Sequence, residues 1–193
     1  MDMDNLEFCL DRIREENIPG DLMETGVCRG GAVIFMQGYL KAWEMRGRTV
    51  WAADSFEGLP KLELEQDAGW DFSKEKFPVL AIDVDRVRNT FARYGLLDDN
   101  VVFLKGWFCD TLPSAPVEKL ALLRLDGDLY ASTMDALTAC YHKVVPGGFV
   151  IIDDWALDPC RKAVEDFRRA HDIDEELIAI DPASVYWRKK TAV

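Results

Sequence analysis

Four carboxylates follow two apolar stretches of this chain in a pattern that suggests chemistry. Asp126 and Asp128 end the stretch "LALLRLDGD", and Asp153 and Asp154 end the stretch "GFVIIDD". Clustered carboxylates in a low-dielectric cleft repel one another and raise their own pKa values unless a positive charge neutralises them. Mg²⁺ suits this role, because it binds a few carboxylates together with water and substrate oxygens. The pattern therefore predicts a magnesium site.

The same acids also have a metal-free interpretation. Some of them could be solvated turn residues, and others could form ion pairs with Arg124 or Arg161. The arrangement in space decides between these readings, because only acids that converge need a shared cation.

A glycine loop, "ETGVCRGG" (24–31), joins an expected strand to an expected helix. Glycines let a ligand approach the backbone closely, and the N-terminus of a helix offers free N–H groups. The spacing of Gly26, Gly30 and Gly31 is not the GxGxxG dinucleotide fingerprint, and Glu24 would repel a pyrophosphate. Glu24 therefore favours a ligand with a cationic or amino group; a tight turn with a capping acid is the alternative.

Asp54 ends the next expected strand, "RTVWAADS". An acid at this position of a nucleotide-binding sheet usually accepts hydrogen bonds from ribose hydroxyls. Together, Glu24 and Asp54 suggest an adenosine-containing ligand without a pyrophosphate, and S-adenosylmethionine fits this description. The alternative is that Asp54 only caps the turn "DSFEGLP".

Few other residues are candidates for chemistry. Trp107 and Trp155 each come just after an expected strand end, where they could touch a ligand. His142 and His171 lie near expected helix ends, where a histidine is favourable without binding anything. The five cysteines form no CxxC pair, so we expect reduced thiols, and neither GxSxG nor HExxH occurs.

These residues need a scaffold, and the hydrophobic pattern indicates one. We expect helices over residues 4–17 (capped by Asp4), 31–47 (closed by Gly47), 83–94, 131–143 and 159–171, and strands over 21–26, 48–55, 100–106, 119–126, 146–155 (a turn at Pro146 followed by a strand), 177–181 and 184–189. Alternating strands and helices predict a parallel sheet covered on both faces, and the last two strands are joined too tightly for a crossover helix. We therefore predict an open, doubly wound α/β sheet with an antiparallel C-terminal strand, in which ligands bind at the carboxyl ends of the strands.

Composition excludes several classes of function. The 193 residues carry a net charge of −12, which disfavours nucleic acid and anionic membrane surfaces as partners. The acidic N-terminus "MDMDNLEF" is not a secretory or transit signal, and no apolar run reaches membrane-spanning length. We expect a soluble cytoplasmic protein with one domain over residues 1–193, in which residues 1–19 carry the first helix.

In several stretches the sequence resembles the macrocin O-methyltransferase (TylF) family, whose members use Mg²⁺ and S-adenosylmethionine to methylate sugar hydroxyls in antibiotic biosynthesis. The matching stretches, in family order, are "METGVCRGGA", "WAADSFEGLP", "NVVFLKGWFCDTLP", "LALLRLDGDLYAST", "PGGFVIIDDW" and "CRKAVEDFR". The resemblance implies a class I methyltransferase (Rossmann-like) sheet and a small-molecule acceptor that is a glycoside or another polyol.

The resemblance also implies roles for individual residues. The cofactor would be held by residues of the glycine loop and of the next three strand ends: Glu24, Thr25, Gly26, Arg29, Gly30, Asp54, Ser55, Gly106, Trp107 and Asp126. Asp126, Asp153 and Asp154 look like the metal ligands, and Asp128 then looks like the general base. A carboxylate in that role takes the proton of a hydroxyl that Mg²⁺ has polarised.

One departure from the family leaves the identity of the acceptor undetermined. Family members commonly carry additional N-terminal residues that help to form a lid, whereas one expected helix precedes the first strand here. The irregular segment 57–80, or a second subunit of a homo-oligomer, would then complete the acceptor site. A phenol or catechol diol is an alternative acceptor, because it also chelates Mg²⁺.

Two other functions are less favoured. "LDGDLY" is similar to the DxDx(T/V) motif of haloacid-dehalogenase-type phosphatases, but Tyr130 replaces Thr or Val and the motif follows several strands. A non-catalytic nucleotide-binding module would have no reason to keep four mutually repulsive acids together.

Overall fold

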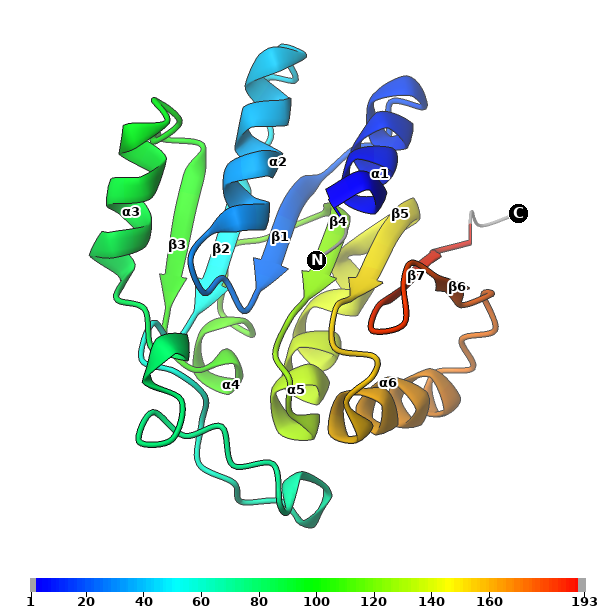
Figure 1. Ribbon diagram of the computed structural model, residues 1–193. Coiled ribbons are helices and arrows are strands. Elements are labelled where there is room, and N and C mark those ends of the chain that lie inside the picture. The colour runs from blue at the N-terminus through cyan, green and yellow to red at the C-terminus, as the bar shows by residue number, and fades with distance from the viewer. Residues whose placement is uncertain (1–2, 191–193) are drawn as a thin grey trace.

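A seven-stranded sheet forms the centre of the protein (Figure 1). The computed structural model describes residues 3–190. The strands are β1 (Asp21–Thr25), β2 (Val50–Asp54), β3 (Val101–Lys105), β4 (Leu120–Leu125), β5 (Val144–Ile152), β6 (Ile178–Ala179) and β7 (Val185–Arg188). Their order is β3-β2-β1-β4-β5-β7-β6. The first five are parallel, whereas β7 runs antiparallel to β5 and β6, which confirms the predicted doubly wound sheet with its reversed end.

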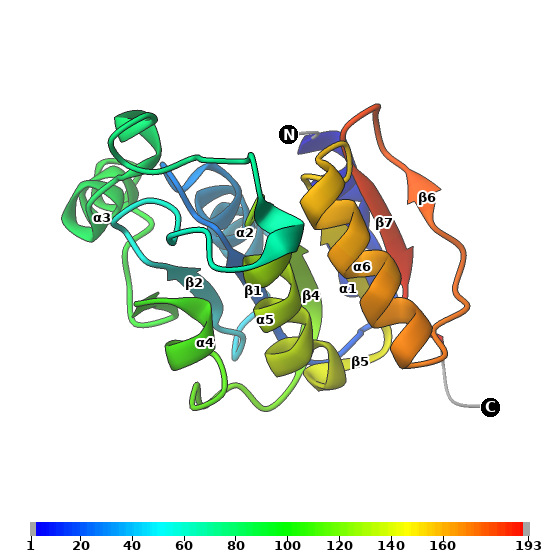
Figure 2. The ribbon, with the colours of Figure 1, turned by 90° about the horizontal axis from the view of Figure 1, so that it is seen from below.

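Helices cover both faces of this sheet (Figures 1 and 2). They are α1 (Met3–Glu15), α2 (Gly31–Ala42), α3 (Val84–Arg93), α4 (Phe108–Thr111), α5 (Tyr130–Cys140) and α6 (Asp158–Ala170). Side chains of the strands alternate between two cores: Leu22 packs in the core with α1, α2 and α3, and Met23 packs in the core with α5 and α6. Burial on both faces explains why a strand such as β4 is apolar almost throughout.

Most of the predicted elements are confirmed, and the boundaries that differ have local causes. Asp4 lies inside the first turn of α1 rather than before it as a cap. Helix α2 ends at Ala42, not near Gly47, because Glu44 adopts a left-handed φ of 50°. The amide of Met45 then donates to the carbonyl of Leu40 at 2.9 Å, which closes the helix as a Schellman motif without a glycine.

Two further boundaries and one short helix depart from expectation. Strand β5 begins at Val144, ahead of the predicted turn at Pro146, and its pairing with β4 is interrupted between Val144 and Phe149. Helix α5 ends at Cys140 and continues as the short 3₁₀ turn η3 (Tyr141–Lys143). The short helix α4 was not predicted.

Segment 57–80 is irregular, as predicted. It contains two 3₁₀ turns, η1 (Glu65–Asp67) and η2 (Pro78–Leu80). Figure 2 shows this stretch crossing the molecule from the end of β2 towards α5, and η1 contacts α5. Across residues 3–190, none of the helices is both long and apolar enough to cross a membrane.

Candidate active site

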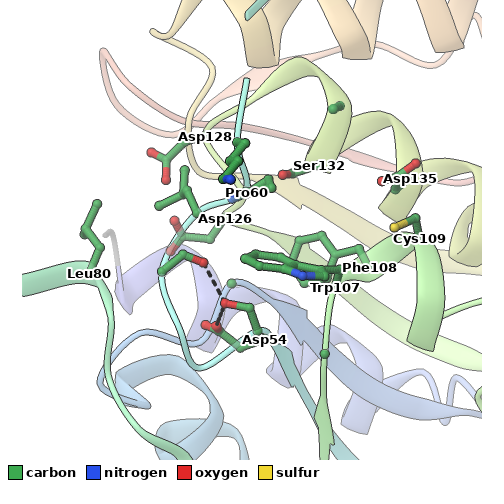
Figure 3. Close-up of a pocket in the computed structure, with 18 of the residues that line it drawn as sticks. Asp54, Pro60, Leu80, Trp107, Phe108, Cys109, Asp126, Asp128, Ser132 and Asp135 are labelled. Atoms are coloured by element: carbon green, nitrogen blue, oxygen red, sulfur yellow. Dashed lines mark hydrogen bonds between the residues drawn. The ribbon is translucent and has the colours of Figure 1, made fainter. Parts of the chain in front are cut away.

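A pocket of about 720 Å³ opens at the carboxyl ends of the parallel strands (Figure 3). This volume suits a small-molecule ligand. The order of the strands reverses between β1 and β4, and such a switch point is where open α/β sheets bind ligands. The residues that line the pocket come from the loops after β1 to β4, from α4 and α5 and from segment 57–80: Gly26, Cys28, Asp54, Ser55, Gly58, Leu59, Pro60, Lys61, Glu63, Leu64, Leu80, Gly106, Trp107, Phe108, Cys109, Asp126, Gly127, Asp128, Ala131, Ser132 and Asp135.

The predicted cofactor residues divide into two groups by position. Those that line the pocket are Gly26, Asp54, Ser55, Gly106, Trp107 and Asp126. Those that do not line it are Glu24, Thr25, Arg29 and Gly30. Glu24 and Thr25 are buried within β1, whereas Arg29 lines a separate surface hollow beside α3. A direct contact between this second group and a cofactor stays a prediction.

Gly26 brings the loop after β1 against the end of β4. Its φ is +93°, and a Cβ built at this position would lie 1.6 Å from the backbone oxygen of Asp126. Any side chain here would displace the backbone, so the close approach requires glycine. Gly30, with φ +86°, is the N-cap residue of α2.

Asp54 joins the loops after β1 and β2. Its Oδ2 accepts hydrogen bonds from the amides of Val27 (2.7 Å) and Cys28 (3.1 Å), and its Oδ1 accepts one from Phe56 (2.7 Å). Asp54 therefore does cap the turn that follows β2. The carboxylate still lines the pocket, so ribose binding stays a prediction.

An apolar wall follows β3. Trp107 precedes α4 and Phe108 begins it, and both side chains line the pocket (Figure 3). Trp107 is exposed, which leaves its ring available to a flat ligand. Trp155, the other tryptophan expected near a ligand, packs against the core of α5 and α6 and does not line the pocket.

Three of the four aspartates after β4 and β5 converge. Leu125 pairs with Ile152, the residues just before the acids, so the two strand ends lie side by side. Asp126, Asp153 and Asp154 each offer a carboxylate oxygen, and these three oxygens lie within 4.8 Å of one another. The backbone amide of Asp128 donates to Oδ2 of Asp154 at 2.9 Å, so the main chain of the fourth acid lies beside this group.

Arg124 lies among these acids. Only 2% of its surface is exposed, and it pairs through Nη1 with Glu24 Oε1 (2.5 Å) and Asp126 Oδ2 (2.8 Å), and through Nη2 with Asp153 Oδ1 (2.6 Å). The predicted alternative of pairing with Arg124 is thus confirmed for two of the acids. Arg161 instead pairs with Asp158 on the exposed start of α6.

One arginine does not neutralise this cluster. Burial raises the pKa of Asp154 to about 8, with added repulsion from Asp126 and Asp128. Burial also raises the pKa of Asp128 to about 6, again with repulsion from neighbouring acids. A further cation would relieve this repulsion, and the carboxylate oxygens that converge here are the donors that Mg²⁺ prefers. The residues present therefore fit a magnesium ion.

Glu24 shares the guanidinium with the acids. Burial raises the pKa of Glu24 to about 8 in spite of the Arg124 pair, and its Oε2 has no hydrogen-bond partner among the described residues. Burial alone would lower the pKa of Arg124, but Glu24, Asp126 and Asp153 together raise it above its ordinary value. Arg124 thus supplies a cation beside Glu24, and a ligand cation at this residue stays a prediction.

Some residues near the pocket were not anticipated. Ser132 and Asp135 line it from the first turns of α5. Asp67 is 1% exposed and binds the start of the same helix. The spacing of Ala131, Ser132 and Asp135 on one helical face could have indicated the first two, but no local pattern marks Asp67. All five cysteines are free, as expected.

The two histidines lie at helix ends. His142 is in η3, and the ring of His171 lies 4.2 Å from that of Phe167 at the end of α6. Neither lines the pocket, which agrees with a structural role.

Comparison with known proteins adds an independent line of evidence. The model of the family described as macrocin-O-methyltransferase (TylF) matches residues 1–189. A mycinamicin III 3''-O-methyltransferase from Micromonospora griseorubida is 49% identical over 191 residues, covering 97% of this chain and 75% of the relative. A demethyldecarbamoylnovobiocin O-methyltransferase from Streptomyces niveus is 49% identical over 190 residues, covering 97% and 72%.

Solved structures of methyltransferases are also similar to this chain. The O-methyltransferase NovP is 48% identical, with a TM-score of 0.94 over 97% of this chain and 79% of that one. The calicheamicin methyltransferase CalS11, at 20% identity and a TM-score of 0.73, shares the fold.

Proposed function

This chain belongs to the macrocin O-methyltransferase (TylF) family and is an O-methyltransferase, and we propose that it methylates a sugar hydroxyl of a secondary metabolite with S-adenosylmethionine and Mg²⁺. The names of its relatives support the acceptor. They include methyltransferases of mycinamicin III, of a rhamnosyl-tetracenomycin and of demethyldecarbamoylnovobiocin. The observation that carries the proposal is the cluster of strand-end acids beside the pocket.

The donor half of the pocket lies over β1, β2 and β3. Gly26 allows the ligand to approach the backbone, and Asp54 has an acceptor oxygen at the strand end where ribose hydroxyls bind in related sheets. Trp107 and Phe108 offer an apolar wall for the adenine and exclude water from it. S-adenosylmethionine, when bound, supplies the methyl group as an electrophile.

The acceptor half lies beside the acid cluster. Asp126, Asp153 and Asp154 would hold the magnesium ion, which would supply Lewis-acid polarisation of the acceptor hydroxyl. Asp128 lines the pocket and would take the proton of that hydroxyl at a carboxylate oxygen. Its raised pKa, about 6, is well matched to a base that must be ionised near neutral pH and still hold a proton.

Arg124 has a positioning role in this proposal. It holds Asp126 and Asp153 at fixed places beneath the pocket and offsets part of their repulsion. The side chain itself does not line the pocket. Glu24 in turn supports Arg124 from the neighbouring strand β1, which pairs with β4.

Methyl transfer from labelled S-adenosylmethionine tests the proposal. A panel of glycosides is compared with catechols, each with Mg²⁺ and with EDTA. We expect glycosides to accept the methyl group only when Mg²⁺ is present. Transfer to catechols alone would overturn the acceptor, and undiminished transfer in EDTA would overturn the metal.

A further inference from the structure

Segment 57–80 forms one wall of the pocket. Its contribution consists of Gly58, Leu59, Pro60, Lys61, Glu63, Leu64 and Leu80. Because this stretch has little regular structure, contacts made by its side chains must hold the wall in place. One of these contacts reaches the helix that follows Asp128.

Asp67 makes that contact. It ends η1 and is 1% exposed, although it is a carboxylate. Its Oδ1 accepts a hydrogen bond from the amide of Tyr130 at 2.6 Å, and its Oδ2 accepts one from Ala131 at 3.2 Å. These are the first two amides of α5, which lack partners within the helix.

Helix α5 has no cap of its own. The residue at its N-cap position is Leu129, whose side chain accepts no hydrogen bond. Asp67 therefore supplies the cap from 63 residues away in the sequence. A carboxylate at this position also interacts favourably with the positive end of the helix dipole.

The capped amides adjoin the residue proposed as the base. Asp128 precedes Tyr130 by two residues and has a left-handed φ of 58°. Its amide is held by Asp154, and the amide of Leu129 donates to the carbonyl of Gly127 at 2.6 Å. The turn of residues 127–129 is thus fixed on one side by Asp154 and on the other by Asp67.

We propose that Asp67 is a positioning residue that couples the pocket wall to the base: it holds segment 57–80 closed and, through the start of α5, keeps Asp128 in its working position. This inference rests on the proposed function, in which Asp128 takes the proton. It predicts that the wall and the base move together, because one buried carboxylate joins them.

Two variants and one control test this role. Asp67→Ala removes both acceptor oxygens, whereas Asp67→Asn keeps one. Asp83→Ala is the matched control, because Asp83 caps α3 through a 2.8 Å bond to the amide of Asp85 and is exposed. Each is made in the natural chain and in the Asp128→Asn background, with folding checked by circular dichroism at the assay temperature.

The measurements are kcat for a glycoside acceptor, Kd for S-adenosylmethionine, and the rate of tryptic cleavage at Lys61, Lys74 and Lys76. Asp67→Ala should lower kcat at least about tenfold, since small misplacements of catalytic groups are costly. Cofactor Kd should change less than about threefold, and cleavage should accelerate. In the Asp128→Asn background, Asp67→Ala should lower kcat less than about threefold, because the base it positions is already gone.

Other results would overturn the inference. Equal kcat values for Asp67→Ala and Asp83→Ala, or an undiminished loss in the Asp128→Asn background, would leave Asp67 with a structural role only. If Asp67→Ala does not fold, the same comparison is made with Asp67→Asn, which should show a smaller loss of the same kind. A normal kcat for Asp128→Asn alone would instead refute the base of the proposed function, and this inference with it.

Discussion

Arg124 Nη2 lies 2.6 Å from Asp153 Oδ1, an ion pair that links the strand end of β4 to the strand end of β5. The same guanidinium also binds Asp126 and Glu24, so three carboxylates share one cation. This arrangement fixes the geometry of the acids while leaving them negative overall. A cluster of this kind suits a dication. Its carboxylate ligands are already in place, and the repulsion between them, which one arginine does not balance, favours binding of a further cation.

The first prediction concerns the metal. Asp153→Asn should lower kcat by at least about 100-fold, because even indirect partners of a metal contribute about 10- to 100-fold. Isothermal titration should show cofactor binding nearly unchanged and the Mg²⁺ signal lost. Asp158→Asn, at an exposed acid five residues further on, is the control. Normal turnover of Asp153→Asn in a chelator would refute the metal assignment.

The second prediction concerns the base. Asp128→Asn should lower kcat by about 10²- to 10⁴-fold, which is the usual contribution of general base catalysis. Asparagine suits the left-handed backbone at this position, and the amide that binds Asp154 remains, so the fold should be retained. Single-turnover kinetics measure the chemical step. An unchanged rate would assign the proton transfer to another group.

The third prediction concerns the glycine loop. Gly26→Ala should destabilise the protein by more than about 3 kcal/mol, because its Cβ would collide with the backbone of Asp126. Gly95→Ala is a matched control: its φ is also positive, at +66°, but no atom lies within 4 Å of the added Cβ. Strain alone should cost about 1 to 2 kcal/mol there. Urea unfolding compares the two, and equal losses would contradict the close approach.

The fourth prediction concerns pH. Burial raises the pKa of Glu24 to about 8 in the folded protein, from about 4.3 in an unfolded chain. The folded state therefore binds this proton more tightly, so its stabilising effect is full below pH 4 and is lost as the pH rises towards 8. In EDTA, the free energy of unfolding of the natural chain should fall over pH 5 to 8 by on the order of 2 kcal/mol more than that of Glu24→Gln.

Glu16→Gln provides the control for this measurement. Glu16 is also paired with an arginine, Arg188, but that pair is exposed and lowers the pKa of Glu16. Its effect is therefore confined to more acidic conditions, and the slope between pH 5 and 8 should match that of the natural chain. Identical slopes for Glu24→Gln and the natural chain would show that Glu24 is ionised throughout.

The sheet could be predicted from the sequence because its signals are local. Apolar strands such as "LALLRL" alternate with amphipathic helices, and the tight connection before the last strand indicates its reversal. The boundaries that differ depend on conformations that composition does not mark. Glu44 in a left-handed conformation ends α2, although glycine is the usual residue there.

The candidate site was predictable in part for the same reason. Strand-end acids can be recognised once the strands are placed. Because β4 and β5 are neighbours in the sheet, Asp126 lies close to Asp153. Arg124 was visible as a lone charge inside a buried strand, and such residues are seldom buried without a partner. Asp67 was not predictable, because its segment has no period and its partners lie 63 and 64 residues away.

The three amides that bind Asp54 have a consequence for how the enzyme can diversify. They rigidify the rim over β1 and β2 before any ligand arrives, so a donor meets a surface that needs little reordering. The opposite rim is an irregular stretch of chain that Asp67 joins to α5 by hydrogen bonds. Under the proposed function, sequence changes in that stretch would alter the acceptor, while the methyl donor would still bind to an unchanged rim.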